Sequence, residues 1–177
     1  MGGNQGERIA RHNQLRDAIH SAAVSAALGP TKEGRFLLPW ADRRQADVLI
    51  SCWTGGKDTA LDVTVINSMQ SDTVVGAATT AGFALTKAYK SKLQGSEEDC
   101  RRQGLVFLPL AAEALGGWHE VAEDQVGKLG GALARHTVHE EGEVKRQLWE
   151  KLSVMLMKGN AALLTNRIPS ETDNYTD

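Results

Sequence analysis

Two aspartates stand in neighbouring apolar segments whose composition is typical of β-strands. Asp47 lies in residues 46–53 and Asp62 lies in residues 59–67, with a glycine-rich turn between them. If the strands pair through this turn, the numbers of facing residues sum to about 111, which puts Asp47 opposite Thr64. A shift of the turn centre by one residue instead puts Asp47 opposite Asp62. Either register places both carboxylates on one face, about 5–8 Å apart at Cβ.

This pair of carboxylates could hold a divalent cation. Two like charges at that separation repel each other, and one carboxyl takes a raised pKa unless something neutralises it. Mg²⁺ prefers carboxylate oxygens and completes its shell with water, so it would stabilise the pair. Asp62 is set in an otherwise apolar strand, and an unpaired buried charge there would cost several kcal/mol. We therefore expect a site for Mg²⁺, or Mn²⁺, at Asp47 and Asp62.

Helices and strands alternate in the segments that must position this pair. Apolar spacing, β-branched residues and Gly or Pro stops predict the elements. Helices are expected at 7–28, 84–103, 119–135 and 143–158, a weak strand at 35–39, further strands at 46–53, 59–67 and 105–113, a turn at 42–45, and a loop with some helical content at 68–82. Gly95 is expected to interrupt or weaken the second helix, and Pro109 is a mild objection to the last strand. The order predicts an α/β sandwich with helices on both faces.

Composition limits the classes of function. The 177 residues suffice for one domain, which we expect over 7–160 with flexible termini at 1–6 and 169–177. No apolar run approaches the roughly 20 residues of a membrane span, and no export signal or cysteine scaffold is visible. An intracellular protein is therefore expected. The formal net charge is −2, which argues against holding duplex DNA by charge alone. Residues 1–90 are mildly basic, with ten Lys or Arg against eight Asp or Glu.

At these residues the sequence resembles a known family. Ala46-Asp47-Val48-Leu49, a short turn, and Leu61-Asp62-Val63-Thr64-Val65 resemble the core of the PD-(D/E)xK nucleases. More narrowly, they resemble the restriction-endonuclease-like domain at the C-terminal end of some non-LTR retrotransposon polyproteins, and related reverse-transcriptase-associated domains. The resemblance covers roughly residues 8–125, and further pieces agree in order: Arg11-His12-Asn13, Cys100, Gly104 to Leu110, Glu113 and Gly116-Gly117-Trp118. It departs from the family at Ala46, where Pro is usual, and at Thr64, where Lys is usual.

The resemblance implies a core of helix, three-stranded meander with a central β-hairpin, helix and strand, followed by C-terminal helices. It also implies that the missing lysine comes from the next helix, where Lys87, Lys90 and Lys92 stand. Lys92 is our first candidate, eight residues before Cys100, and Lys90 the second. An ammonium there would lie near the attacking water or the scissile phosphate. Possible accessory residues are Thr64, Glu33, His12 and Glu113, each of which could equally be a structural or surface residue.

The function implied is a Mg²⁺-dependent DNA endonuclease with nicking activity. Its partner would be duplex or nicked DNA, with phosphate contacts from Arg8, Arg11, Arg43 and Arg44. The chain could be part of a larger reverse-transcriptase polyprotein, nuclear if it comes from a eukaryotic retroelement. The alternative is a catalytically inactive module of the same fold that binds nucleic acid or protein, which Thr64 in the lysine position favours. Metal binding that depends on the two aspartates distinguishes these hypotheses.

Overall fold

The computed structural model describes residues 3–34 and 46–165, which form five helices and four strands. In chain order the elements are α1 (Gly3–Ser25), β1 (Thr31–Gly34), β2 (Ala46–Thr54), β3 (Lys57–Ile66), α2 (Val74–Thr79), α3 (Phe83–Arg102), β4 (Val106–Glu113), α4 (Glu120–Thr137) and α5 (Glu141–Thr165). The mixed α/β class predicted from the sequence is therefore confirmed.

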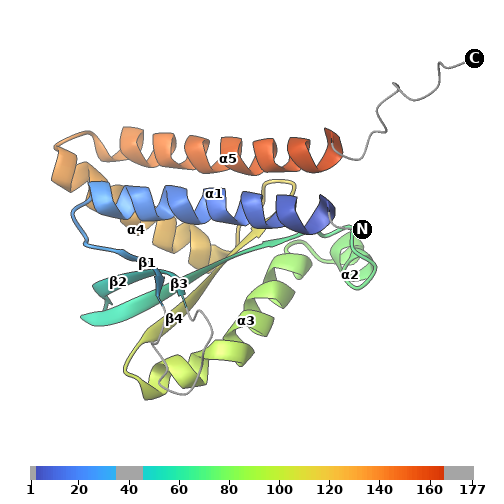
Figure 1. Ribbon diagram of the computed structural model, residues 1–177, viewed down its shortest axis with the longest axis horizontal. Coiled ribbons are helices and arrows are strands. Elements are labelled where there is room, and N and C mark those ends of the chain that lie inside the picture. The colour runs from blue at the N-terminus through green and yellow to red at the C-terminus, as the bar shows by residue number, and fades with distance from the viewer. Residues whose placement is uncertain (1–2, 35–45, 166–177) are drawn as a thin grey trace, which may run out of the picture.

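The four strands form one mixed sheet in the order β1-β2-β3-β4 (Figure 1). The first three make an antiparallel meander, whereas β4 runs parallel to β3. Parallel neighbours need a long crossover connection, and here α2 and α3 supply it. The crossover brings α3 back across the sheet, where it packs against β3 and β4.

Helices cover both faces of the sheet. The larger core lies between the sheet and the group α1, α4 and α5, while α3 covers the opposite face (Figure 1). Val48, Ile50, Leu61 and Val63 point into the larger core. The smaller core, on the side of α3, contains Ala60, Cys100 and Phe107, with Leu49 and Leu93 packed against it. This two-sided packing is the predicted sandwich.

A β-bulge sets the register of the central hairpin. The residue numbers of two paired residues add up to 111 at the turn, where Thr54 pairs with Lys57. They add up to 109 on the other side of the bulge, where Ile50 pairs with Thr59 and Val48 with Leu61. The change occurs across Ser51–Trp53, where Cys52 adopts a left-handed φ of 54°. Gly55 and Gly56 at the turn have φ of 59° and 76°, which matches the positive values that a tight hairpin turn requires. Both registers considered from the sequence thus occur, one on each side of the bulge.

Some element boundaries differ from the prediction. α1 begins at Gly3, so residues 3–6, expected to form a flexible terminus, are helical. β1 lies at Thr31–Gly34, before the expected strand; the segments predicted as strand 35–39 and turn 42–45, and the tail 169–177, lie outside the described residues. Gly95 does not interrupt α3. The predicted loop contains the short helix α2.

Pro109 is compatible with its strand because β4 pairs only with β3 among the described strands. An edge strand tolerates the missing N–H of proline. The two predicted C-terminal helices are present as α4 and α5, and α5 continues to Thr165.

Candidate functional site

The register brings the two predicted carboxylates directly across from each other. Val48 pairs with Leu61, and one residue further along the same register Asp47 faces Asp62. Because Val48 and Leu61 enter the larger core, the alternation of side chains turns both aspartates to the face that α3 covers. Their side chains are only 12% and 18% exposed, respectively. Two largely buried acids therefore share one position on adjacent strands.

Asp62 forms an ion pair with one lysine of α3. The Nζ of Lys92 lies 2.7 Å from Oδ2 of Asp62. Despite this contact, Oδ2 is buried and receives no hydrogen bond of good angle from the described residues. The ammonium of Lys92 offsets the negative charge of this oxygen, which keeps further lone-pair capacity that no other described residue uses. A bound cation or water would use that capacity.

The helix geometry explains why Lys92 is the lysine that reaches the aspartate. Successive residues turn by 100° around an α-helix, so Lys90 and Lys92 lie about 200° apart. Lys90 is accordingly exposed. Lys87 pairs with Asp72, its Nζ lying 2.8 Å from Oδ2. Of the three candidate lysines, the structure brings only Lys92 to the acid pair.

Asp47 is held by a histidine and by the backbone of β3. Nε2 of His12, on α1, lies 3.0 Å from Oδ1 of Asp47. The backbone N–H of Val63 donates to Oδ2 at 2.7 Å. Each carboxylate oxygen therefore has one contact and retains further lone-pair capacity. His12, which the sequence suggested only as an accessory residue, lies in direct contact with the predicted metal ligand.

The two acid–base contacts have different electrostatic consequences. The hydrogen bond with Asp47 raises the pKa of His12 above its usual value, against the opposing effect of burial; the charges of Asp47 and Asp62 add to the increase. Burial raises the pKa of the Asp62 carboxyl, and the ammonium of Lys92 offsets part of that increase. Perturbed groups gathered in one place are typical of functional sites.

A pocket of about 400 Å³ adjoins this pair. His12, Lys92 and Thr64 belong to its wall, and so does Val63, whose N–H binds Asp47. The pocket lies at the end of the sheet where the chain leaves β3 toward α2, and it is lined further by Arg8, Arg11, Val65, Asn67, Gln70, Ala114, Leu115, Asn160, Leu163 and Leu164. No Asp or Glu occurs among these described lining residues. The acids therefore stand next to a cavity whose charged side chains are all basic.

Arg11 is a buried member of this wall. Its side chain donates from Nη1 to Oδ1 of Asn160 on α5, and Asn160 in turn donates to the carbonyl of Ala114. Only 7% of Arg11, one of the predicted phosphate contacts, is exposed. Burial, and then the nearby charge of Arg8, lower the pKa of its guanidinium. Arg11 lines the pocket, and its contact with phosphate stays a prediction.

The remaining candidates lie at different distances from the pair. Thr64 follows Asp62 by two residues on the same face and lines the pocket. Glu113 is paired in register with Ile66, four residues along β3 from Asp62, and its carboxylate accepts a hydrogen bond from Ser68. Glu33 lies in β1, but its side chain is outside the described part of the structure, as are Arg43 and Arg44.

Asn160 is the residue that sequence reasoning missed. It stands 149 residues from Arg11, beyond the helix predicted at 143–158 and near the end of α5, so no local signal identifies it. Gly159 beside it was the only available clue. A Cβ on Gly159 would approach the Cγ of Arg11 to 2.5 Å, so the glycine is what allows α1 and the arginine to lie this close to α5.

Within the described residues, no cluster of three or more His, Cys, Asp or Glu is arranged to hold a metal ion. Two carboxylates and water are nevertheless a common ligand set for Mg²⁺. Asp47 and Asp62 supply these two carboxylates, and the further lone-pair capacity of Asp62 Oδ2 points to the same chemistry. The residues present therefore fit Mg²⁺ or Mn²⁺ bound by two protein ligands.

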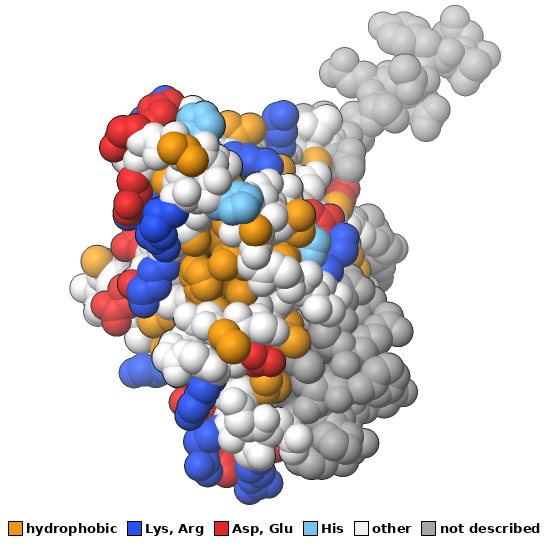
Figure 2. Space-filling model, turned by 90° about the vertical axis from the view of Figure 1, so that its left-hand side faces the viewer, with side chains coloured by type: hydrophobic (Ala, Val, Ile, Leu, Met, Phe, Trp, Pro, Cys, Tyr) orange, Lys and Arg blue, Asp and Glu red, His pale blue; other side chains and the backbone are white. Residues whose placement is uncertain are grey.

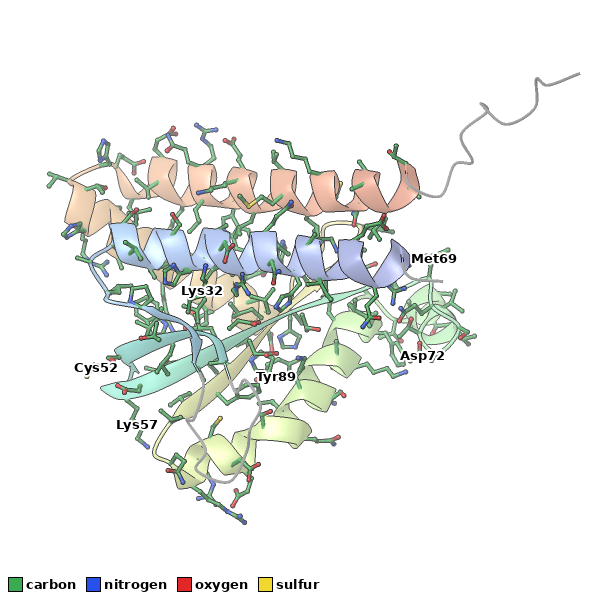
Figure 3. All side chains as sticks on the ribbon, in the orientation of Figure 1. Lys32, Cys52, Lys57, Met69, Asp72 and Tyr89 are labelled. Carbon is green, nitrogen blue, oxygen red and sulfur yellow. The ribbon has the colours of Figure 1, made fainter. Side chains whose placement is uncertain are left out.

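The opposite end of the molecule has a different character. Figure 3 shows Cys52 and Lys57 at the hairpin end of the sheet, far from Met69 and Asp72 near α2. The hairpin end presents apolar side chains surrounded by charges of both signs (Figure 2). Two lysines of the neighbouring helices form ion pairs, Lys128 with Asp124 and Lys145 with Glu141. A continuous basic surface is not seen on that face.

Comparison with known proteins finds no matching family model and no matching curated protein. Among the described helices, none combines the length and apolar character needed to span a membrane.

Proposed function

We propose that this protein is a metal-dependent phosphodiesterase that nicks DNA at the site formed by Asp47, Asp62 and Lys92. The observation that carries the proposal is the contact of 2.7 Å between Lys92 and Asp62. This contact brings one lysine of the crossover helix to two acids that face each other on adjacent strands. Supporting it, the basic pocket beside the pair would favour a phosphate group. The retroelement setting, the nuclear location and the larger polyprotein stay predictions.

The fold supports the same proposal. A helix, an antiparallel meander of three strands, a crossover and a parallel fourth strand follow one another in the order implied by the PD-(D/E)xK resemblance. The aspartates lie on the two central strands, and the lysine lies on the crossover helix. We propose on this basis that the domain is restriction-endonuclease-like, with the lysine displaced from the position of Thr64 to Lys92.

Each side chain has a separate task in the proposed reaction. Asp47 and Asp62 would hold Mg²⁺ or Mn²⁺, which when bound supplies Lewis-acid stabilisation of the phosphoryl group. Lys92 orients the attacking water and offsets negative charge on the phosphate. His12, whose raised pKa favours the protonated form, orients Asp47 and adds positive charge next to the substrate. Arg8 contacts the backbone phosphate from the rim of the pocket.

Nicking of supercoiled plasmid in Mg²⁺ or Mn²⁺ tests the proposal. Asp62→Asn should abolish nicking, and Lys92→Gln should lower its rate by about 10²-fold or more, since one positioned catalytic group contributes about 10²–10⁴-fold. Lys90→Gln is the matched control, because Lys90 is exposed on the other side of the same helix. It should leave the rate within about two-fold of wild type.

Absence of nicking by the wild type, together with no Mg²⁺ or Mn²⁺ bound in calorimetry, would refute the catalytic proposal. Equal loss in Lys90→Gln and Lys92→Gln would refute the assignment of the lysine. Circular dichroism of each variant shows whether a loss of activity merely reflects unfolding.

One observation favours a second function, a catalytically inactive module of the same fold. Both carboxylates already have cationic partners, Lys92 for Asp62 and His12 for Asp47. Such pairs could serve only to stabilise the sheet, and the pocket would then bind nucleic acid without cleaving it. This second function would be favoured if the wild-type protein bound DNA but did not bind metal ions and did not nick the plasmid.

A further inference from the structure

The wall of the pocket beside the acids has a basic part and an apolar part. Arg8, Arg11 and Lys92 form its basic part, and Leu115, Leu163 and Leu164 form an apolar part. Leu115 and Leu164 are 70% and 63% exposed, although leucine is usually buried. A ligand that covers both parts must itself have an anionic end and an apolar body.

The basic part contains an incompletely satisfied guanidinium. Arg11 is more than nine-tenths buried, yet its Nε has no hydrogen-bond partner among the described residues. Among the described residues that line the pocket there is no Asp or Glu to neutralise it. Nor does any described carboxylate form an ion pair with Arg8. Two cations held together without an acid cost free energy, and a bound anion would relieve that cost.

The size of the pocket limits the ligand. A volume of about 400 Å³ lies toward the lower end of the roughly 300–1,000 Å³ range of small-molecule sites. One nucleotide fits such a volume, whereas a stacked base pair within a duplex does not enter it. Asn67 and Gln70 add amide groups to the wall, and amide side chains can hydrogen-bond the polar edge of a base.

We infer that this pocket binds one unpaired nucleotide, its phosphate against Arg8 and Arg11 and its base against Leu115, Leu163 and Leu164. The inference rests on the proposed function, which it deepens by naming the substrate class. The protein acts on a strand whose base is out of the stack: single-stranded DNA, a splayed end or a flap. Extruding a base from an intact duplex costs a few kcal/mol, so these substrates are preferred over continuous duplex.

Calorimetry in EDTA tests the pocket without any turnover. The probes are deoxyadenosine monophosphate, deoxyadenosine and inorganic phosphate, each titrated into the full chain. The nucleotide should bind at least about ten-fold more tightly than either fragment, because only the nucleotide covers both parts of the wall. Equal affinities for nucleotide and phosphate would reduce the site to an anion site, and absence of nucleotide binding would overturn the inference outright.

Two variants assign the parts of the wall. Arg8→Gln should weaken both the nucleotide and phosphate about five-fold or more. The double variant Leu115→Ser with Leu164→Ser should weaken the nucleotide by a similar factor and leave phosphate unchanged. The matched control is Val24→Ser with Val138→Ser, two valines that are exposed but do not line the pocket. Weakening by the control as large as that by the leucine pair would contradict the assignment.

The substrate preference is measured with labelled oligonucleotides in Mg²⁺. A splayed-arm substrate should be cut at least about ten-fold faster than the continuous duplex of the same sequence, and equal rates would overturn the preference. The two proposals fail separately. Nucleotide binding without cleavage of any DNA refutes the nuclease and keeps the pocket, while cleavage without nucleotide binding refutes the pocket and keeps the nuclease.

Discussion

At the scale of single residues, the two aspartates have unequal surroundings. Asp47 is engaged by His12 and by a backbone N–H. Asp62 faces one lysine and has a buried oxygen without a well-directed hydrogen bond. Burial raises the pKa of Asp62, so its ionised form costs the folded protein free energy. A residue kept at such a cost is expected to have a function other than stability.

The pH dependence of stability should reveal the contact between His12 and Asp47. The pKa of His12 is raised in the folded protein from an ordinary value of 6.5. The stabilisation is therefore fully present below 6.5 and is lost as the pH rises through the folded pKa. His12→Gln should lower the free energy of unfolding by about 1 kcal/mol at acidic pH, and this difference should shrink as the pH rises above neutrality.

Chemical denaturation at a series of pH values between about 5.5 and about 9 measures this difference. His139→Gln is the control, an exposed histidine that follows α4. A difference between wild type and His12→Gln that grows with pH would contradict the contact.

The sequence was informative about these residues only in part. The apolar setting of Asp62 and the alternation in its strand predicted both acids on one face. The sequence could not separate Lys87, Lys90 and Lys92, because the rotation of α3 about its axis depends on packing between the helix and the sheet. It was the resemblance that favoured Lys92, and the contact with Asp62 now provides the physical reason.

At the scale of elements, the close packing of α1 against α5 depends on a missing side chain. Gly159 lies where a Cβ would come within 2.8 Å of the Cβ of Arg11, and closer still to its Cγ. These atoms are near the backbone of α1 and cannot move aside independently of the helix. The pocket owes the position of Arg11 to this approach.

Replacing Gly159 by Ala should destabilise the protein, although the same exchange usually stabilises a helix. We expect a loss of about 1–3 kcal/mol from overpacking. Gly95→Ala in α3 is the matched control, because its Cβ would meet no atom within 4 Å. It should stabilise the protein by about 0.5–1 kcal/mol. Thermal or urea unfolding measures both, and stabilisation by Gly159→Ala would contradict the packing described.

Elements with strong local patterns were predictable, and those set by distant contacts were not. Alternating β-branched residues identified β3, and helical spacing identified α1, α4 and α5. The position of β1 depends on pairing with β2, as between Thr31 and Leu49, which no local pattern encodes. The bulge at Cys52 was likewise not predictable. The change of register leaves each side chain of the strand on the same face of the sheet, so the alternation of apolar and polar residues does not reveal it.

At the scale of the whole molecule, the pocket brings three cations together, Arg8, Arg11 and Lys92. On the helical surfaces arginines and lysines form ion pairs within single helices, for example Arg146 with Glu143 and Glu150. The net charge of −2 is consistent with a protein that contacts few phosphates of a DNA backbone. Binding should therefore depend on a few contacts.

The salt dependence of binding to single-stranded DNA should accordingly be shallow. Three cations, Arg8, Arg11 and Lys92, line the pocket, and each neutralised phosphate of a single strand contributes about −0.7 to the slope of log K against log salt concentration. We expect a slope of about −2, measured by fluorescence anisotropy in EDTA. Arg8→Gln should make it shallower by about 0.7, whereas Lys90→Gln should not. A much steeper slope in the wild type would point to a wider contact surface.

The antiparallel packing of α1 and α5 also determines how the molecule responds to mechanical force. The start of α1 and the end of α5 lie at the same end of the molecule (Figure 1), close to the contact of Arg11 with Asn160. Tension applied between these two points would unzip the helices turn by turn instead of shearing them along their length. The first contacts to yield would be those of the pocket wall, while the aspartates, held between strands of the sheet, would yield later. A nucleotide held in the pocket, as inferred above, would thus be released before the acid pair came apart.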